Sequence, residues 1–334
     1  MTSTSTNAPL YLVTGAAGYV GSELVRHLAA RGERVRAMAR RLKQLAPFDN
    51  PRIEPFEGDI RDRAAMDRAM AGVAGVYHIA ALFRHANVPD SAYRETNLEG
   101  TRNVMEAAIA AGVPRLIHCS TIGVLGHVEN PPADETTEYM PADLYQVSKM
   151  EGEKLALELF RSQRIGGVVI RPAMIYGPGD TRLRKIFRMI AHRRFFYVGR
   201  GDSLVHFIDV RDLARAFILA MEHTERNGEI YIIAGERAMP LKEFAEEVAQ
   251  VLQVPPPWLR LPVRPMQMLG TLCEAVCVPL RIPPPIYRRR VDFYTKSRSF
   301  ATRKAQQELG FAPRQGLQGE IRDIIADYRQ RGWL

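Results

Sequence analysis

The chain contains 334 residues, of which 46% are hydrophobic and 25% are charged, with a formal net charge of +9 and three cysteines. This composition is ordinary for a globular protein with a sizeable core, and the length suits one large α/β domain or two smaller ones. Three cysteines are too few for a disulfide framework, and no stretch approaches the ~18 apolar residues of a membrane span. Residues 1–9 lack the basic and apolar regions of a signal peptide, so we expect a disordered tail there and a protein of the reducing cytoplasm.

The positive charge does not by itself indicate a nucleic-acid partner. The arginines are scattered, apart from runs such as Arg288–Arg290, and no aromatic-rich RNA-binding motif accompanies them. We therefore expect no nucleic acid, and an anionic cofactor is the simpler partner for a basic chain. Cys273 and Cys277 are one helical turn apart but have no cluster of His or Cys beside them, so no metal site is expected.

Short apolar runs alternate with amphipathic stretches over the first two thirds of the chain. The apolar runs predict strands over Leu10–Thr14, Arg34–Ala39, Ile53–Glu57, Gly75–Ile79, Arg115–Cys119 and Gly167–Arg171. The helical patterns between them include Tyr19–Arg31, Asn97–Ala111 and Leu144–Arg164. This alternation predicts an α/β fold with a doubly wound parallel sheet, whose ligands bind beyond the carboxyl ends of the strands.

The pattern becomes less regular after Pro172, and proline is frequent between Val254 and Pro285. We expect residues 10–172 to form a nucleotide-binding domain, and segments near 205–234 (a helix pattern followed by a strand pattern) to return to its sheet. Residues 173–204 and 235–334 then form a smaller C-terminal substrate-binding region.

A glycine-rich turn connects the first predicted strand to the first helix. Its glycines, Gly15, Gly18 and Gly21, permit a tight turn, close approach of a pyrophosphate to the backbone, and close packing of the helix on the strand. The free N–H groups at the start of the helix suit phosphate oxygens. The position of the triad predicts a dinucleotide site rather than an ordinary turn.

Tyr145 and Lys149 are four residues apart, which places both side chains on one face of a helix. An ammonium beside a phenol favours the phenolate, so we expect the pKa of Tyr145 to be lowered toward neutrality. Such a tyrosine can exchange a proton with a carbonyl oxygen or a secondary alcohol. The pair alone is a weak signal, because a surface tyrosine beside a solvated lysine has the same spacing.

The glycine spacing together with Tyr-x-x-x-Lys resembles the extended short-chain dehydrogenase/reductase family, the NAD(P)-dependent epimerase/dehydratase superfamily, over nearly the whole chain. The sequence most resembles the family's 3β-hydroxysteroid dehydrogenase and dihydroflavonol reductase-like branch. This resemblance implies a Rossmann-type sheet. Further matching segments are 58–62, 78–81, 95–104, 171–179, 207–212 and 304–311. The resemblance implies the following cofactor-binding residues: Gly15, Ala17, Gly18, Tyr19, Val20, Arg40, Asp59, Ile60, Ala80, Ala81, Asn97, Ser120, Tyr145, Lys149, Pro172 and Ala173.

The end of the second strand bears on the choice between NAD and NADP. A carboxylate there would accept hydrogen bonds from the ribose and repel a 2′-phosphate, but this chain has Ala39 followed by Arg40. The Arg40 guanidinium can pair with a 2′-phosphate or stack on the adenine. We therefore expect NADP, with NAD as the second choice, while solvated arginines at a strand end are the alternative interpretation.

The resemblance implies a catalytic hydroxyl after the fifth strand, and the spacing to Gly126 selects Thr121, with Ser120 as the alternative. Thr121 would hold the substrate oxygen near the Tyr145 phenol, and Lys149 would also contact the nicotinamide ribose. Asn97 either holds its helix in register or binds a water linked to Lys149. The three histidines beside apolar runs are expected to be packing residues; they are His78, His118 and His206.

Three differences distinguish this chain from nucleotide-sugar enzymes. Met174 and Val205 stand where many such relatives carry an Asn and an Arg that contact the diphosphate, and Ile122-Gly123 replaces the Asp-Glu of sugar dehydratases. The apolar stretch 265–280 predicts a helix that covers a lipophilic substrate, rests on a membrane surface as a peripheral contact, or simply packs in the core.

These features together predict an NADP(H)-dependent oxidoreductase that interconverts a ketone and a secondary alcohol on a rather apolar substrate. The catalytic residues would be Tyr145, Lys149 and Thr121. A nucleotide-sugar epimerase is the alternative enzyme, and a cofactor-sensing protein without catalysis is a third class. Relatives commonly form homodimers through the two helices that carry Asn97 and Tyr145, so a homodimer is expected by analogy.

Overall fold

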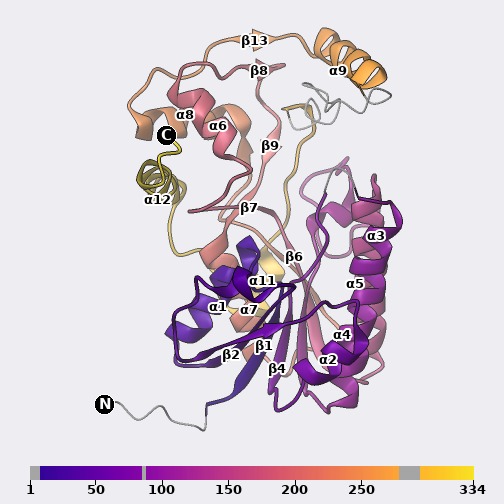
Figure 1. The fold of residues 1–334 in the computed structure, drawn as a ribbon. Helices are drawn as coiled ribbons and strands as arrows, with labels where there is room; N and C mark the ends of the chain where they lie inside the picture. Colours follow the sequence, from indigo (N-terminus) through magenta and orange to yellow (C-terminus); the bar gives the residue numbers. More distant parts are fainter. Residues whose placement is uncertain (1–7, 85–87, 278–293) are drawn as a thin grey trace.

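A seven-stranded parallel sheet forms the centre of the molecule (Figure 1). The computed structural model describes residues 8–84, 88–277 and 294–334, so most of the expected tail and the run Arg288–Arg290 lie outside the described residues. The strand order is β11-β6-β5-β4-β1-β2-β3, with every neighbouring pair parallel. The strands are β1 (Leu10–Thr14), β2 (Arg34–Ala39), β3 (Ile53–Glu57), β4 (Gly75–His78), β5 (Arg115–Cys119), β6 (Gly166–Pro172) and β11 (Ile230–Ile233).

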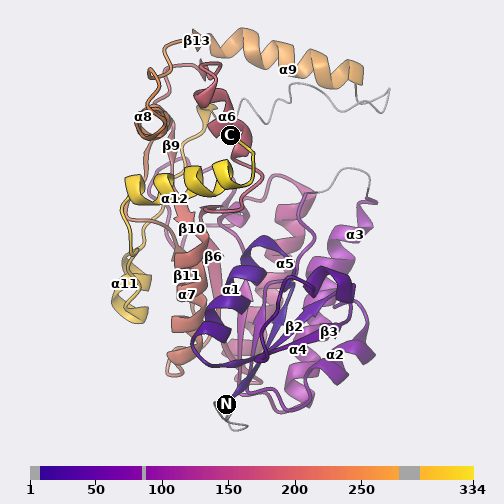
Figure 2. The same cartoon turned by 60° about the vertical axis from the view of Figure 1, so that its left-hand side comes forward.

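Helices cover both faces of this sheet, as the alternation of patterns predicted (Figures 1 and 2). One face carries α1 (Tyr19–Ala30), α7 (Val210–Glu222) and α11 (Arg303–Leu309), and the other carries α2 (Arg63–Ala69), α4 (Gly100–Ala110) and α5 (Leu144–Arg161). A separate apolar cluster fills the space on each face. The prediction of a Rossmann-type doubly wound sheet is therefore confirmed.

Two predicted helices differ from the structure by more than one residue at an end. The segment predicted as one helix from Asn97 begins with a π-helical turn, Glu95–Glu99, before α4, and a short helix α3 (Ser91–Arg94) precedes that turn. Helix α5 ends at Arg161 because Gln163 adopts a positive φ of 58°. A right-handed helix cannot continue through a residue with this backbone conformation.

The remaining elements gather beyond the carboxyl ends of the parallel strands (Figure 1). A third apolar cluster holds α6 (Arg184–Ala191), α8 (Leu241–Leu252) and α12 (Leu317–Gln330) together. Short two-stranded sheets lie in the same part: β7 (Met174–Tyr176) with β10 (Phe207–Asp209), β9 (Leu204–Val205) with β12 (Met239–Pro240), and β8 (Tyr197–Val198) with β13 (Arg260–Leu261). Of the segments expected to return to the sheet, β11 pairs with β6, whereas β10 pairs with β7 outside it.

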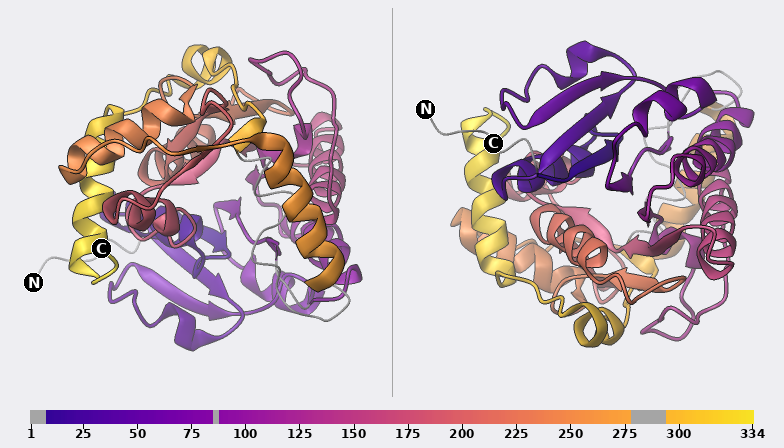
Figure 3. Two further views of the ribbon diagram at one scale, coloured as in Figure 1. Left: turned by 90° about the horizontal axis from the view of Figure 1, so that it is seen from above. Right: turned by 90° about the horizontal axis from the view of Figure 1, so that it is seen from below.

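Helix α9 (Val263–Cys277) lies at the outer rim of this second part (Figures 2 and 3). Core packing was one interpretation of its apolar pattern, and that interpretation is wrong: Gly270 is its only buried residue. Met268 and Leu272 are 73% and 62% exposed because the stripe with a spacing of four faces away from the protein. Within the described residues, no helix combines the length and the apolar character needed to cross a membrane.

Candidate active site

The backbone turns at Gly15–Gly18 between β1 and α1, at the carboxyl edge of the sheet, and we call the concave side of this turn the glycine-rich recess. Gly15 has a φ of +71°, and a Cβ on it would lie 2.8 Å from the backbone of Ala80. A Cβ on Gly21 would collide with the Gly15 carbonyl oxygen, so both positions require glycine. Ala17 and Gly18 are exposed, and no side chain caps the start of α1, which leaves its N–H groups directed at the recess. The residues present therefore fit the pyrophosphate of a dinucleotide.

The residues expected near the adenosine lie at the ends of β2, β3 and β4. Arg40 is exposed directly after the buried Ala39. Burial by itself would raise the pKa of Asp59, but hydrogen bonds from Arg61 and the charges of Arg61 and Arg40 hold that pKa below its ordinary value. Asp59 is thus an ionised acceptor beside a cationic strand end. Ile60 is buried, while Ala80 and Ala81 are partly or fully exposed after β4.

Tyr145 lies in the first turn of α5 and is 8% exposed. Burial raises the pKa of its phenol to about 12, and the charge of Arg84 and a hydrogen bond with the Thr121 side chain act in the opposite direction. The expected lowering toward neutrality is therefore wrong for this structure, because loss of hydration outweighs the nearby positive charge. At neutral pH the Tyr145 phenol carries its proton.

Lys149 is one turn further along the same face of α5, and it too is buried. Its Nζ donates a hydrogen bond to the Cys119 carbonyl oxygen at 2.6 Å. Burial lowers the pKa of Lys149, with the Cys119 and Glu153 side chains opposing that shift. The cation that most lowers the pKa of Tyr145 is consequently Arg84 rather than Lys149.

The structure distinguishes the two candidate hydroxyls after β5. The Thr121 Oγ1 accepts a hydrogen bond from the Gly123 N–H at 3.0 Å and so caps the short 3-10 turn Ile122–Leu125. The hydroxyl hydrogen of Thr121 can therefore be donated to Tyr145 or to a ligand. Ser120 is buried, and its hydroxyl donates to the Glu153 carboxylate. Thr121, not Ser120, is therefore the hydroxyl beside Tyr145.

Glu153 is a buried residue of the site region that the sequence analysis missed. Its carboxylate accepts hydrogen bonds from Ser120, from the Tyr139 hydroxyl at 2.7 Å, and from Arg171 at 2.6–3.2 Å. Both members of the Glu153–Arg171 pair are almost completely buried. The pair connects α5 to the carboxyl ends of β5 and β6. Its only sequence signal is the position of Glu153 one turn after Lys149.

Asn97 fastens the loop after β4 to α5. Its Oδ1 accepts from the Leu82 N–H at 2.7 Å, and its Nδ2 donates to the Leu82 carbonyl oxygen at 3.1 Å and to the Ser148 hydroxyl at 2.9 Å. Asn97 is buried in the π-helical turn. Two roles were predicted for Asn97, and these contacts agree with the structural one, in which it holds its helix in register.

The three histidines singled out by the sequence are buried. His78 bonds to Thr14 at 2.9 Å and to Thr101 at 3.0 Å, and burial together with the charge of Lys149 lowers its pKa to about 3. His118 packs against His78 with ring centroids 5.2 Å apart, and His206 bonds to the Gly235 carbonyl oxygen. All three are therefore neutral packing residues, as predicted.

The two positions that replace diphosphate contacts have different surroundings. Met174 on β7 is partly exposed, whereas Val205 is completely buried in the third apolar cluster. The Val205 side chain fills the core and offers no polar contact at this position. Pro172 and Ala173 are buried where β6 ends.

Arg84 and Phe83 also contact Tyr145, and the sequence analysis did not select them. The Phe83 and Tyr145 rings meet edge to face with centroids 5.0 Å apart. The Arg84 guanidinium lies 5.0 Å from the centre of the Tyr145 ring and donates two hydrogen bonds to Asp143, the residue that caps α5. No motif marks these residues, which belong to the loop after β4.

This arrangement of a glycine-rich turn, a Tyr–Lys pair on one helix and a hydroxyl after β5 defines an NAD(P)-dependent enzyme of the short-chain dehydrogenase/reductase type. The model of the NAD dependent epimerase/dehydratase family matches residues 11–234, and the chain belongs to this family.

Three proteins illustrate its similarities. Sterol demethylase protein B of Methylococcus capsulatus is 32% identical, with 97% of this chain and 99% of the relative covered. The 3β-hydroxysteroid dehydrogenase/Δ5→4-isomerase of Mycobacterium tuberculosis is 30% identical over 95% of this chain and 90% of its own length. The crystal structure of gox2253 superposes with a TM-score of 0.82 at 31% identity, covering 97% of this chain and 99% of that one. The predicted resemblance to the hydroxysteroid dehydrogenase-like branch of the extended family is confirmed.

Proposed function

We propose that this protein is an NADP(H)-dependent oxidoreductase that interconverts a ketone and a secondary alcohol on a rather apolar substrate. The observation that carries the proposal is the buried, protonated Tyr145, whose phenol interacts with the Thr121 side chain and lies one helical turn before Lys149. These groups lie at the carboxyl edge of the sheet, the edge that also holds the glycine-rich recess. A proton donor and a hydride source are therefore brought to one edge.

The bound nicotinamide cofactor supplies or accepts the hydride. In the reducing direction, Tyr145 donates its proton to the carbonyl oxygen, and a pKa raised to about 12 keeps that proton in place at neutral pH. Thr121 donates a hydrogen bond to the same oxygen and holds it beside the phenol. Lys149 offers a buried positive charge that favours the phenolate once the proton has left. Proton return from solvent then restores Tyr145.

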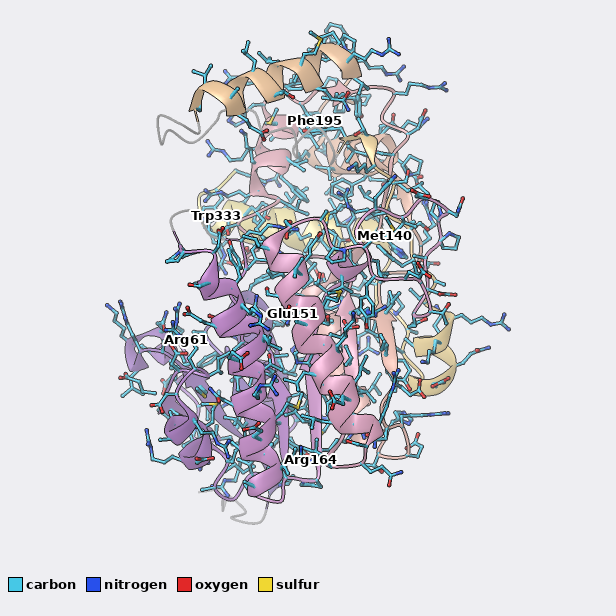
Figure 4. All side chains as sticks on the ribbon, turned by 90° about the vertical axis from the view of Figure 1, so that its right-hand side faces the viewer. Arg61, Met140, Glu151, Arg164, Phe195 and Trp333 are labelled. Carbon is cyan, nitrogen blue, oxygen red and sulfur yellow. The ribbon has the colours of Figure 1, made fainter. Side chains whose placement is uncertain are left out.

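Apolar side chains around Tyr145 support a substrate with a substantial apolar part. Phe83, Met140 and Leu144 are roughly half exposed; Phe83 follows β4, Met140 lies in the loop before α5, and Leu144 is the first residue of α5. Figure 4 shows Met140 near the upper end of α5, toward the second part of the molecule. Exposed large apolar groups that gather near a catalytic residue are typical of a site that buries an apolar ligand. The similarity to a hydroxysteroid dehydrogenase points the same way.

Cofactor consumption distinguishes this function from the alternatives. With a panel of medium-chain and cyclic ketones, an oxidoreductase consumes NADPH in step with alcohol formed, whereas a nucleotide-sugar epimerase shows no net cofactor turnover. Tyr145→Phe should lower kcat by roughly 10²–10⁴-fold while cofactor affinity, measured by fluorescence titration, is retained. Leu42→Ala, an exposed position outside the site, serves as the control. Full activity of Tyr145→Phe would reject the mechanism, and epimerisation of a nucleotide sugar without net turnover would favour the second enzyme class.

The preference for NADP rests on Arg40. Its exposed guanidinium follows Ala39, so no carboxylate at the end of β2 opposes a 2′-phosphate. Charge-assisted hydrogen bonds contribute about 1.5–3 kcal/mol, so Arg40→Gln should weaken NADPH binding roughly 10- to 100-fold and leave NADH binding nearly unchanged. Equal loss for both cofactors would contradict this assignment.

We also propose that α9 makes a peripheral contact with an anionic membrane. Its outward stripe includes Met268 and Leu272, and Arg260 and Arg264 are exposed beside it, which combines an apolar face with positive charge. Met268→Ser/Leu272→Ser should reduce co-sedimentation with vesicles that contain phosphatidylserine. Wild-type protein that remains in the supernatant with such vesicles would reject the contact.

A homodimer through α4 and α5 is proposed by analogy with the family. The outer face of these helices has a groove lined by Leu98 and Leu155 between charged side chains, and Glu151 marks this face in Figure 4. Leu155→Arg should therefore yield a monomer in light scattering, whereas Leu42→Arg should not. A wild-type monomer at micromolar concentration would contradict the proposal.

A further inference from the structure

Arg84 is held in a fixed position beside the catalytic tyrosine. The Asn97 side chain binds both the N–H and the carbonyl oxygen of Leu82, which fixes the loop two residues before Arg84. The Arg84 Nε and Nη2 donate to the same Asp143 oxygen, Oδ2, at 3.0 Å and 2.8 Å. The other Asp143 oxygen caps α5 two residues before Tyr145. The guanidinium is thus tied to the helix that positions the phenol.

One edge of the guanidinium has no hydrogen-bond acceptor among the residues that the structure describes. A guanidinium has five N–H donors, and Asp143 uses those on the Nε side. The Nη1 group donates to none of the residues that the structure describes, and the side chain is 29% exposed. The free Nη1–Nη2 edge has the fork geometry that binds a carboxylate through two parallel hydrogen bonds.

We propose that Arg84 is a specificity-determining residue that binds a carboxylate on the carbon next to the reacting carbonyl carbon, which makes 3-oxo and 3-hydroxy carboxylic acids the substrate class. This assignment rests on the proposed ketone and secondary-alcohol chemistry. The guanidinium carbon lies 5.0 Å from the Tyr145 ring centre. A substrate carboxylate on the carbon next to the carbonyl carbon can therefore reach Arg84 while the carbonyl oxygen binds Tyr145 and Thr121.

The charge around Arg84 selects a monoanion. Asp143 is paired with Arg84 and partly cancels its charge, so a phosphate or diphosphate would meet a nearby carboxylate as well as the guanidinium. A carboxylate needs only the free fork. The apolar part of the substrate then lies against Phe83, whose ring meets that of Tyr145 edge to face, and against the exposed Met140 and Leu144.

The test compares a medium-chain 3-oxoalkanoate with the methyl ketone that has the same chain but no carboxylate. Wild-type enzyme should prefer the 3-oxoalkanoate by about 10- to 100-fold in kcat/KM, the size of charge-assisted hydrogen bonds. Arg84→Gln should remove most of this preference through a higher KM, and Arg84→Lys should keep part of it. The ratio between the two substrates is the readout, because any effect of Arg84 on proton transfer by Tyr145 changes both substrates alike.

Arg31→Gln is the matched control, since Arg31 forms an exposed pair with Glu222 at the far end of α1. Cofactor affinity and Tm confirm that each variant is folded. A wild-type enzyme without preference for the carboxylate, or an unchanged ratio in Arg84→Gln, overturns the assignment while the proposed function stands. An enzyme that turns over neither ketone rejects the proposed function, and the assignment with it.

Discussion

The buried pair of Glu153 and Arg171 permits a quantitative prediction from the geometry. Glu153→Gln removes the negative charge but keeps the size of the side chain. Arg171 is then a buried cation without its counter-ion, although it donates three hydrogen bonds to Glu153 in the wild-type protein. Breaking a buried pair by removing one partner lowers the free energy of unfolding by about 3–5 kcal/mol. Each kcal/mol lost lowers Tm by roughly 2–4 °C or less in a chain of this size.

The control lies on the same helix. Glu151 pairs with Arg94 at 3.1 Å on the surface, where an ion pair contributes about 0–1 kcal/mol, so Glu151→Gln should leave the urea midpoint almost unchanged. The double variant Glu153→Leu/Arg171→Leu should be more stable than Glu153→Gln, because no charge remains buried. Urea unfolding followed by circular dichroism measures all three variants. A loss below about 1 kcal/mol for Glu153→Gln, or a double variant less stable than Glu153→Gln, would refute the reasoning.

Three further predictions follow from single contacts. Thr121→Val should lower kcat for ketone reduction by about 10²-fold, whereas Ser120→Ala should affect urea stability more than kcat, as steady-state kinetics of both variants will show. Gly15→Ala should abolish dinucleotide binding in calorimetry, because its Cβ would meet the Ala80 backbone at 2.8 Å; retained affinity would argue against the recess. Burial raises the pKa of Glu320 from 4.5 to about 7, so the folded state holds a proton that the unfolded chain releases. The free energy of unfolding should fall as pH rises between these values, and Glu320→Gln should remove on the order of 3 kcal/mol of this dependence; an identical pH profile would contradict it.

The elements of the sheet were predictable because their signals are local. Alternating apolar runs and the glycine triad determine β1, the turn and α1 within a few residues, and their bounds agree with the prediction. The π-helical turn at Glu95–Glu99 was not predictable, because it depends on Asn97 reaching Leu82 and Ser148 from distant segments. Helical periodicity also did not reveal that the apolar stripe of α9 faces outward, since the same pattern serves a core helix.

The candidate site divides in the same way. Tyr145 and Lys149 are four residues apart, so helical geometry alone brings them to one face. Glu153 was missed because its partners Ser120, Tyr139 and Arg171 come from three other segments of the chain. Long-range polar contacts of this kind leave no spacing pattern in a sequence.

The sequence by itself determined the family and the doubly wound sheet, and it selected the residues proposed to handle the proton, because each depends on short, ordered motifs. Only the tertiary structure decided the electrostatics of those residues. Burial raises the pKa of Tyr145, and Arg84, 61 positions earlier in the chain, is the cation that most opposes this shift. The physical reason is that hydration and charge proximity depend on what surrounds an atom in space, and distant segments supply those surroundings here.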